Sequence, residues 1–361
     1  MPFIDLHSDI LVDVVWRRAH GEHRVMEERH CPALRKAGIN ALGLTIWIEL
    51  DQTHRAAART REVINALEAE LRESPGALAL VRTPAEAEAA MRTGKLAILL
   101  TIEGMAALDE DPALFSDLCD LGLTSGLMTW NEANAFASGF PGYHYAEART
   151  LSTQGNGSWL TGLNGPGEGE VQGLTAKGRA LLKQMADAGV MLDLSHLNEK
   201  TFWEAIAAYP GTGVFASHSN ARSICSIPRN LSDDQIKAIA ERDGIIGLNA
   251  FSAFVDPDRP GIDRFIDHAV YIADLVGVHH LGFGFDFIDY LEAEALESIG
   301  GTLPRNPELH GAADVPPLVE RMEQRGFSPS EIEAITWGNF ARVWRSAILH
   351  SEISTAGNRN K

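Results

Sequence analysis

Short apolar segments alternate with longer segments of helical pattern along most of this chain, and this alternation restricts the fold more than any other feature. Strands that are almost continuously hydrophobic and that alternate with helices form parallel sheets with both faces covered. The pattern therefore predicts an α/β fold with a buried parallel sheet. The expected strands are residues 2–8, 39–48, 95–102, 122–130, 189–195, 213–217, 244–250 and 280–285.

Several of the intervening segments begin with helix start signals, as in residues 83–86 (TPAE), 232–235 (SDDQ) and 328–331 (SPSE). In the first of these, Thr83 can cap the helix, proline fits the first turn and Glu86 can complete a capping box. Eight such strand–helix units predict a (β/α)8 TIM-like barrel. A doubly wound open sheet is the alternative, but no Gly-x-Gly-x-x-Gly follows an expected strand to support nucleotide binding.

We expect a single barrel domain over residues 1–350 and a C-terminal tail over residues 351–361. Two long segments interrupt the alternation: residues 139–173, which contain nine glycines, and residues 287–317, which are rich in proline and acidic residues. Loops of this length are usually lids, binding loops or disordered segments. We expect residues 139–173 to form a lid, because they contain side chains that can pack: Tyr143, His144, Tyr145 and Trp159.

The formal net charge of −18 disfavours nucleic acid or an anionic membrane surface as a partner, since both need clustered Lys and Arg. The three cysteines are widely spaced and form no Cys-x-x-Cys pair, so neither a disulfide framework nor a thiolate zinc cluster is indicated. The first residues do not show a basic n-region followed by an apolar h-region, and no apolar run reaches the length of a membrane span. These features together predict a cytoplasmic protein.

Metal-ligand side chains stand at the carboxyl ends of five expected strands. In a parallel barrel those ends open on one face, where active sites of this architecture lie. Any one buried histidine is more often a hydrogen-bonded core residue than a ligand, but five strands that end in the same way argue for a site. The side chains are His7 and Asp9 after the first strand, Glu103 after the third, His196 after the fifth, His218 after the sixth and Asp286 after the eighth.

Three imidazoles and three carboxylates exceed the roughly four ligands of one tetrahedral zinc ion, and they suit two cations bridged by a carboxylate. In the first strand, simple alternation places Phe3, Asp5, His7 and Asp9 on one face. Asp5 would then either orient a ligand imidazole or be solvated at the strand end. A bridged pair of metals activates water and polarises a carbonyl group, so the predicted reaction is hydrolysis of an amide or ester.

Several segments also resemble the renal (membrane) dipeptidase-type zinc peptidases, family M19, within the amidohydrolase-like metal-dependent barrels. The segments are FIDLHSD near the start, TIEG around Glu103, GLTAKGRALLKQMADAGVMLDLSH at 173–196, SHSNARSICSIPRNLSDDQIKAI at 217–239, GFGFDF at 282–287 and WGNFARVW at 337–344. The resemblance implies that His7 and Asp9 bind one Zn²⁺, that His196 and His218 bind the other, and that Glu103 bridges both.

The resemblance implies two further roles. Arg229, in IPRNLSDD, matches the arginine that grips the terminal carboxylate of the substrate, which suits the fork geometry of a guanidinium group. Asp286 matches the aspartate beside the bridging water, where it can relay a proton to the leaving amine. A departure lies at LMTWNEANAF, where Trp130 replaces a histidine of many relatives; Asn131 or His144 would then supply its hydrogen bond to the oxyanion, or the substrate preference has changed.

The expected function is hydrolysis of small dipeptides, including those with a D-configured C-terminal residue, by a metal-bridging hydroxide. The dipeptide is the expected partner, with Arg229, Trp130 and Asn131 as its binding residues, and the resemblance makes a homodimer the assembly to expect. Two alternatives remain: an amidohydrolase acting on N-acyl amino acids, lactones or cyclic amides, and a catalytically inactive barrel that binds a ligand.

Overall fold

A parallel sheet forms the centre of the protein, of which the computed structural model describes residues 1–139, 172–291 and 306–359. All eight predicted strands are present, and the sheet closes nearly into a barrel in the order β1-β2-β4-β5-β6-β7-β8-β9. The strands are β1 (Ile4–Ser8), β2 (Ala41–Trp47), β3 (Leu78–Leu80), β4 (Leu96–Glu103), β5 (Leu123–Leu127), β6 (Met191–Asp193), β7 (Val214–Ala216), β8 (Ile245–Leu248) and β9 (Leu281–Phe283). The prediction of an α/β barrel is confirmed, and the open sheet is excluded.

The strand β3 was not expected from the sequence. It pairs with Leu96–Ile98 in the first half of β4, while β5 pairs with Leu100–Glu103 in the second half. At three residues it is too short to show a strand pattern in the sequence.

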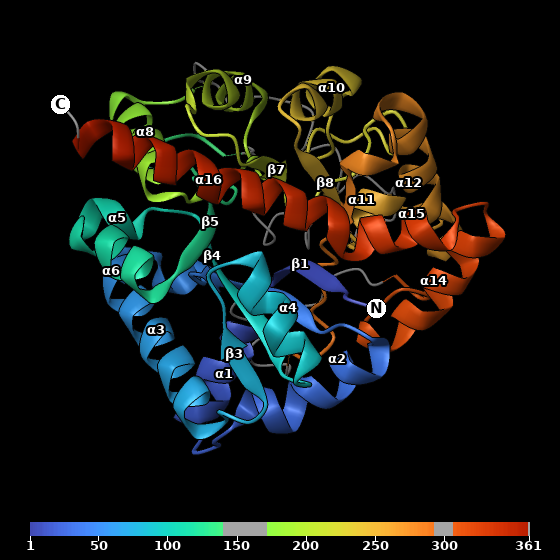
Figure 1. The fold of residues 1–361 in the computed structure, drawn as a ribbon, viewed down its shortest axis with the longest axis horizontal. Helices are drawn as coiled ribbons and strands as arrows, with labels where there is room; N and C mark the ends of the chain where they lie inside the picture. Colours follow the sequence, from blue (N-terminus) through green and yellow to red (C-terminus); the bar gives the residue numbers. More distant parts are fainter. Residues whose placement is uncertain (140–171, 292–305, 360–361) are drawn as a thin grey trace, which may run out of the picture.

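Helices surround the barrel on the outside (Figure 1). They are α1 (Ile10–Ala19), α2 (Cys31–Ala37), α3 (Ala56–Glu73), α4 (Pro84–Arg92), α5 (Ala107–Glu110), α6 (Ala113–Leu121), α8 (Ala176–Ala188), α9 (Glu199–Ala208), α10 (Asp233–Glu241), α11 (Ser252–Val255), α12 (Ile262–Val276), α14 (Val315–Gln324), α15 (Pro329–Glu333) and α16 (Asn339–Arg359). Shorter 3₁₀ segments are Leu50–Arg55, Val278–His280 and Ala312–Asp314, and single π turns are Met26–His30 and Ala334–Gly338. No helix among the described residues is both long enough and apolar enough to cross a membrane.

The predicted helix starts are found at α4, α10 and α15. Ser232 and Ser328 each form a complete capping box with the residue three positions later. Thr83 caps α4 by accepting the Glu86 N–H, but the Glu86 carboxylate accepts from the Arg82 N–H instead of completing the box. These three helices therefore begin at the residues where the sequence predicts a helix start.

The junction between β1 and β9 is closed by a side chain. Asp5 is buried, and its Oδ1 accepts the Phe285 N–H at 2.9 Å and the His7 N–H at 3.3 Å. Phe3 and Phe283 pack across the same junction with ring centroids 5.6 Å apart. Solvation of Asp5 at a strand end, one of the two expectations, is thus wrong, because this carboxylate is 2% exposed.

The pairing of β1 with β2 shifts register between Asp5 and Ser8. Such an irregularity interrupts strict alternation and re-aims the side chains that follow it. All five residues of β1 are buried, so neither face of this strand is solvated.

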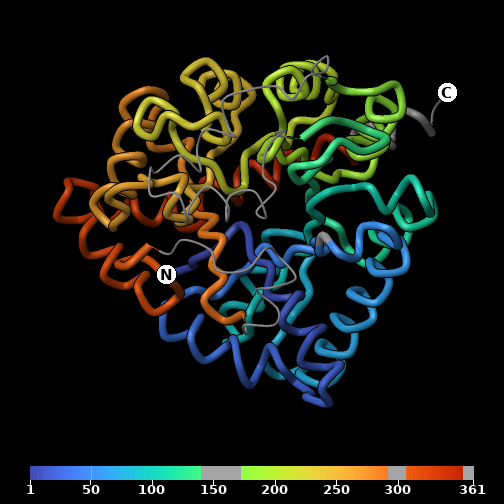
Figure 2. Tube along the Cα trace, turned by 180° about the vertical axis from the view of Figure 1, so that it is seen from behind, coloured from blue at the N-terminus to red at the C-terminus, as the bar shows by residue number. Residues whose placement is uncertain are grey.

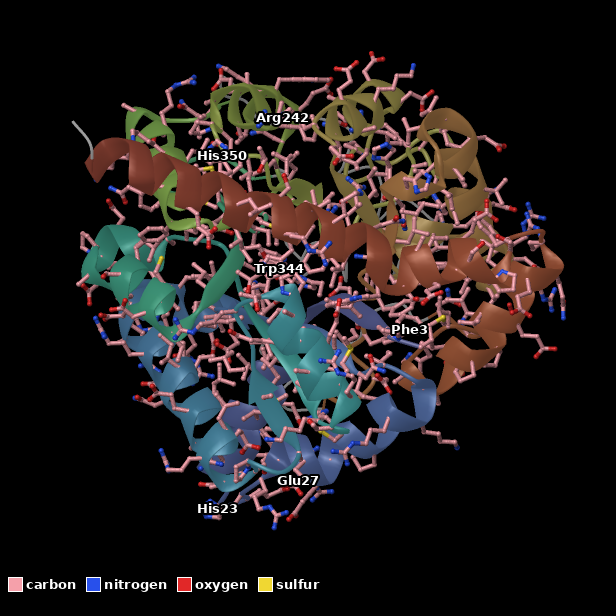
Figure 3. All side chains as sticks on the ribbon, in the orientation of Figure 1. Phe3, His23, Glu27, Arg242, Trp344 and His350 are labelled. Atoms are coloured by element: carbon pink, nitrogen blue, oxygen red, sulfur yellow. The ribbon has the colours of Figure 1, made fainter. Side chains whose placement is uncertain are left out.

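The helix α16 crosses the barrel at the amino ends of the strands. Phe340 and Trp344 on this helix pack with Ile4, Phe215 and Ile245 at the starts of strands, and Trp344 is buried near the middle of the view in Figure 3. Figure 2 shows the opposite side, with α16 behind the barrel. The amino ends of the strands are thus covered by an apolar helix face, and the carboxyl ends face the other way.

Parts of the predicted loops lie outside the described residues, including Tyr143, His144, Tyr145 and Trp159 of the expected lid. Within residues 287–317, a 3₁₀ segment occupies Ala312–Asp314, and α14 begins at Val315. The helix α16 runs past residue 350, the predicted end of the domain, to Arg359. The division into one domain and a tail stays a prediction.

His268 on α12 gives the fold a pH dependence that can be measured. It is fully buried, and its Nδ1 accepts the Ala221 N–H at 3.1 Å while its Nε2 donates to the Val255 carbonyl at 2.9 Å. Burial lowers the pKa of this imidazole to about 4. Because the unfolded chain binds the proton near pH 6.5, the contribution of His268 to stability is complete above that pH and is lost as the pH falls towards 4.

We expect the free energy of unfolding attributable to His268 to fall by about 2 to 3 kcal/mol between pH 7 and pH 4.5. Denaturant unfolding of the wild type and of the His268→Gln variant at both values measures it. The variant should show the smaller pH dependence. Identical pH dependence in the two proteins would contradict the prediction.

Candidate metal centre

The structure brings the five predicted metal ligands and the predicted catalytic residue Asp286 together at the carboxyl ends of the strands. Each is carried by the end of its strand or by the residues directly after it. His7 is in β1, Asp9 follows it, Glu103 ends β4, and His196, His218 and Asp286 follow β6, β7 and β9. The predicted convergence is therefore confirmed.

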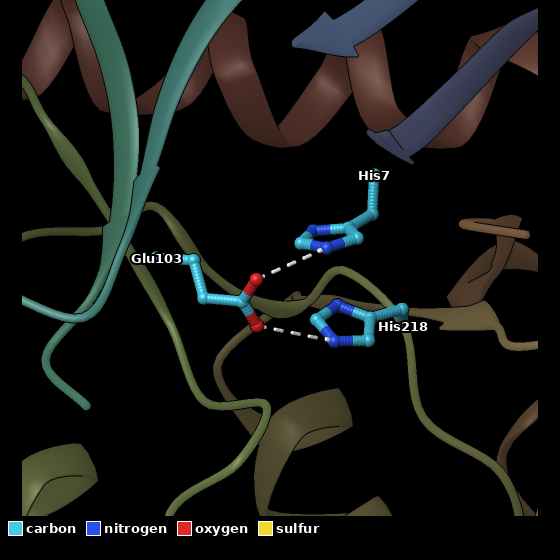
Figure 4. A group of neighbouring side chains, drawn as sticks. All are labelled: His7, Glu103 and His218. Carbon is cyan, nitrogen blue, oxygen red and sulfur yellow. Dashed lines mark ion pairs between the residues drawn. The ribbon is translucent and has the colours of Figure 1, made fainter. Parts of the chain in front are cut away.

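Glu103 lies at the centre of the group and is 3% exposed. Its Oε2 is 3.4 Å from His7 Nε2, while its Oε1 is 3.1 Å from His196 Nε2 and 3.6 Å from His218 Nε2. Figure 4 shows the two oxygens of Glu103 facing His7 and His218. Within the described part of the chain, Oε1 has no hydrogen-bond donor, so this buried oxygen is available to a cation.

A second group of acceptors adjoins His7. Its Nε2 is 3.5 Å from Asp9 Oδ2 and 4.0 Å from Asp286 Oδ1. The ligand atoms of His7, Asp9 and Asp286 lie within 4.8 Å of one another, as do those of His7, Glu103 and His218. Asp9 Oδ1 is also buried without a hydrogen-bond donor among the described residues. Two overlapping groups of this size, with unsatisfied oxygens in both, fit divalent cations chemically.

The two remaining imidazoles face each other. The Nε2 atoms of His196 and His218 are 2.8 Å apart. Each ring forms a second hydrogen bond through its other nitrogen, Nδ1. Asn131 Oδ1 lies 2.8 Å from His196 Nδ1, and Ser217 Oγ lies 2.6 Å from His218 Nδ1. An acceptor at Nδ1 fixes the proton there and leaves the lone pair of Nε2 directed into the centre, as metal ligation requires.

The electrostatics of the centre favour a bound cation. Burial raises the pKa of Glu103 to about 7 and that of Asp286 to about 6, and it lowers the pKa values of His196 and His218 well below the usual range. For His7, burial acts in the same direction, but the carboxylates of Glu103 and Asp9 outweigh it and raise the pKa. Buried carboxylates beside neutral imidazoles are the electrostatic environment that a cation stabilises.

Two buried residues that were not predicted hold this arrangement in place. Asp193 Oδ1 accepts the Ser195 N–H at 3.0 Å and the Ser217 N–H at 2.9 Å, which ties together the segments that carry His196 and His218. Asn249 Nδ2 donates to Asp286 Oδ2 at 3.0 Å. Asp193 stands three residues before His196 in the sequence, but no local pattern shows that it binds backbone across two strands.

The backbone at the site is constrained. His196 and Asp286 have φ values of 64° and 60°. These values lie in the left-handed region, which costs a residue other than glycine about 1–3 kcal/mol. The Ser217 carbonyl is wedged against Gly247 and Gly284, where a Cβ atom would lie 1.9 Å from its oxygen. The glycines and the two strained residues together fix the directions of the histidine and aspartate side chains.

The predicted substrate-binding residues surround a small cavity of about 70 Å³ over the centre. Arg229 is 5% exposed and donates to Ser219 Oγ and to the His218 carbonyl, both at 3.0 Å. Trp130 also lines the cavity, with its ring centroid 6.1 Å from that of His196. Asn131 lines it too, but its Oδ1 is engaged with His196, so it positions this ring.

Comparisons with known proteins agree with this geometry. The family model described as membrane dipeptidase (peptidase family M19) matches residues 1–159 and 150–356. An uncharacterized Klebsiella pneumoniae protein from the pqqA 5′ region is 31% identical over 280 residues, covering 76% of this chain and 90% of that protein. The uncharacterized dipeptidase C3A11.10c of Schizosaccharomyces pombe is 26% identical over 69% of this chain and 52% of its own length.

Among solved structures, a metallopeptidase from Rhodobacter sphaeroides has the same fold. It matches with a TM-score of 0.79 and 22% identity, covering 96% of this chain and 99% of that one. Its crystal structure is liganded with a phosphinate mimic of the dipeptide L-Ala-D-Ala.

Proposed function

The chain belongs to peptidase family M19, the membrane dipeptidase family, and is a metal-dependent dipeptidase; we propose that its centre holds two zinc ions with Glu103 as their shared ligand. The placement of the Glu103 oxygens supports this most directly. One faces His7, and the other faces His196 and His218 without a hydrogen-bond donor among the described residues. A carboxylate shared by two cations presents its oxygens in this way.

His7 and Asp9 would hold one ion, and His196 and His218 the other. The hydrogen bonds behind the histidine rings and the unsatisfied oxygens of Asp9 and Glu103 fit this assignment. When bound, two zinc ions supply Lewis-acid chemistry that polarises the scissile carbonyl and acidifies the attacking water.

The proton transfers belong to Asp286 in this proposal. Its Oδ2 accepts a hydrogen bond from Asn249 and its Oδ1 lies 4.0 Å from His7 Nε2, so its carboxylate is held at the edge of the centre. There it can take a proton from the attacking water and pass it to the amine that leaves. Burial raises its pKa towards neutrality, which suits a group that must both accept and donate a proton.

Arg229 would bind the C-terminal carboxylate of the substrate. It lines the same cavity as Glu103, and its guanidinium stacks 5.3 Å from the centroid of Phe254. A fixed guanidinium next to the reacting groups limits the substrate to one residue beyond the scissile bond. The mimic bound to the Rhodobacter relative suggests that a D-configured C-terminal residue is accepted here as well.

The proposal is tested by the metal content of the purified protein together with a substrate panel. We expect elemental analysis to give close to two zinc ions per chain. We also expect L-Ala-L-Ala and L-Ala-D-Ala to be hydrolysed about 100-fold more efficiently than N-acetyl-L-alanine. One ion or none would contradict the shared-ligand design, and a preference for N-acetyl-L-alanine would assign the site to N-acyl amino acids.

A further inference from the structure

A second and larger cavity adjoins the metal centre on the side of β2, β4 and β5. Its volume is about 740 Å³, against about 70 Å³ for the cavity directly over the centre. Trp47, Glu103, Trp130 and Asn131 line both cavities, so the two share a wall. The larger cavity therefore starts at the carboxylate that the proposed zinc ions share.

The larger cavity and Arg229 belong to different parts of the barrel rim. Arg229 follows β7, whereas the walls of the cavity come from the segments that follow β2, β4 and β5. In the order of the sheet, β7 is four strands from β2, three from β4 and two from β5. A dipeptide with its carboxylate on Arg229 and its peptide bond beside Glu103 would therefore direct its N-terminal residue into this cavity.

The charge of the cavity is one-sided. Its described lining includes the carboxylates of Asp109, Glu110 and Glu132 and no Lys, Arg or His. Asp109 is paired with Lys177 at 2.6 Å, and Glu110 accepts the Ala57 N–H at 2.8 Å.

Glu132 differs from the other two carboxylates. Its carboxylate accepts hydrogen bonds from the backbone and from the Asn134 side chain, including a long one of 3.4 Å from the Trp130 N–H to Oε1, and none of these donors carries a positive charge. Burial outweighs these hydrogen bonds and raises the pKa of Glu132, so the negative charge is less stable here than in water. A cation that enters the cavity would stabilise the negative charge of Glu132.

The aromatic walls suit the same kind of group. The rings of Trp47 and Trp130 meet edge to face with centroids 5.4 Å apart. Indole rings attract ammonium and guanidinium groups and pack against the methylene stems that carry them. The volume, the charge and the walls thus all suit a long side chain with a positive end.

We propose that the larger cavity binds a basic side chain, that of an N-terminal Lys or Arg of the dipeptide, with Glu132 as its counter-charge. This inference rests on the proposed function, because it places the scissile bond at Glu103 and the substrate carboxylate at Arg229. It makes the enzyme selective for dipeptides that begin with a basic residue.

The test compares L-Lys-L-Ala with L-norleucyl-L-Ala, whose side chain has nearly the same length and no charge. The ratio of their kcat/KM values is measured for the zinc-loaded wild type, for Glu132→Gln and for Glu320→Gln. Glu320 is exposed on α14 and does not line the cavity, and its variant removes the same charge. We expect a ratio above about 10 in the wild type and in Glu320→Gln, and a ratio near one in Glu132→Gln.

A wild-type ratio near one overturns the inference, and so does a high ratio that Glu132→Gln leaves unchanged. Hydrolysis of L-norleucyl-L-Ala in either case leaves the proposed function standing. Failure of the zinc-loaded enzyme to hydrolyse either dipeptide overturns both. The wild-type ratio decides the question by itself if Glu132→Gln does not fold.

Discussion

Replacing Glu103 by Gln is expected to lower kcat/KM for L-Ala-L-Ala about a thousandfold or more, equivalent to at least about 4 kcal/mol of transition-state stabilisation. The amide keeps the size of the side chain but has only one acceptor oxygen. Its NH₂ group would face either His7 or the pair His196 and His218, because the carboxylate oxygens point to both. We therefore expect the metal content to fall from two ions per chain to one or fewer.

Stability separates this effect from misfolding. Since burial raises the pKa of Glu103 to about 7, a neutral side chain is favoured there when no metal is bound. The metal-free Glu103→Gln variant should thus unfold at a temperature no lower than the metal-free wild type, and Glu320→Gln should keep full activity. A Glu103→Gln enzyme with wild-type activity and two bound ions would refute the role of this residue.

Replacing Arg229 by Lys is expected to lower kcat/KM for L-Ala-L-Ala about 100-fold, mainly through KM. A lysine keeps the positive charge but cannot form two parallel hydrogen bonds to a carboxylate. It also cannot keep both bonds that the guanidinium makes to Ser219 Oγ and the His218 carbonyl, so its ammonium group has no fixed position. We therefore expect kcat/KM to fall even though the positive charge is kept.

The dipeptide amide L-Ala-L-Ala-NH₂, which lacks the carboxylate, provides the control. The wild type should prefer the free dipeptide over the amide by about 100-fold, and Arg229→Lys should lose most of that preference. An unchanged preference in the variant would mean that another group recognises the carboxylate. The metal content of Arg229→Lys should stay at two, because the hydrogen bond from Arg229 to His218 goes to the carbonyl group and not to the ligand ring.

The fold could be predicted because its strands are nearly all apolar and buried on both faces. Such strands stand out from the amphipathic helices between them, and this is why all eight were placed correctly. The short strand β3 carries too few residues to show a pattern, and the register shift after Asp5 depends on how β1 pairs with β2. Both features are set by tertiary packing that no local pattern contains.

The convergence of the six ligand side chains followed from the same reasoning, since the polarity of a parallel barrel places its strand ends on one face. What could not be predicted are contacts between distant parts of the chain. Asn131 reaches His196 across 65 positions, and Asn249 reaches Asp286 across 37. The sequence indicated Asn131 and Trp130 as substrate-binding residues. Only the structure shows that Asn131 forms a hydrogen bond with the His196 ring.

The hydrogen bond from Phe285 to Asp5 has a consequence for biosynthesis. The two residues are 280 positions apart, so the ribosome releases the first of them tens of seconds before the second at ordinary rates of translation. His7 and Asp9 emerge with Asp5, and Asp286 emerges with Phe285. A nascent chain therefore cannot close β1 onto β9, or bring Asp286 to the five proposed ligands, until most of the 361 residues have been synthesised.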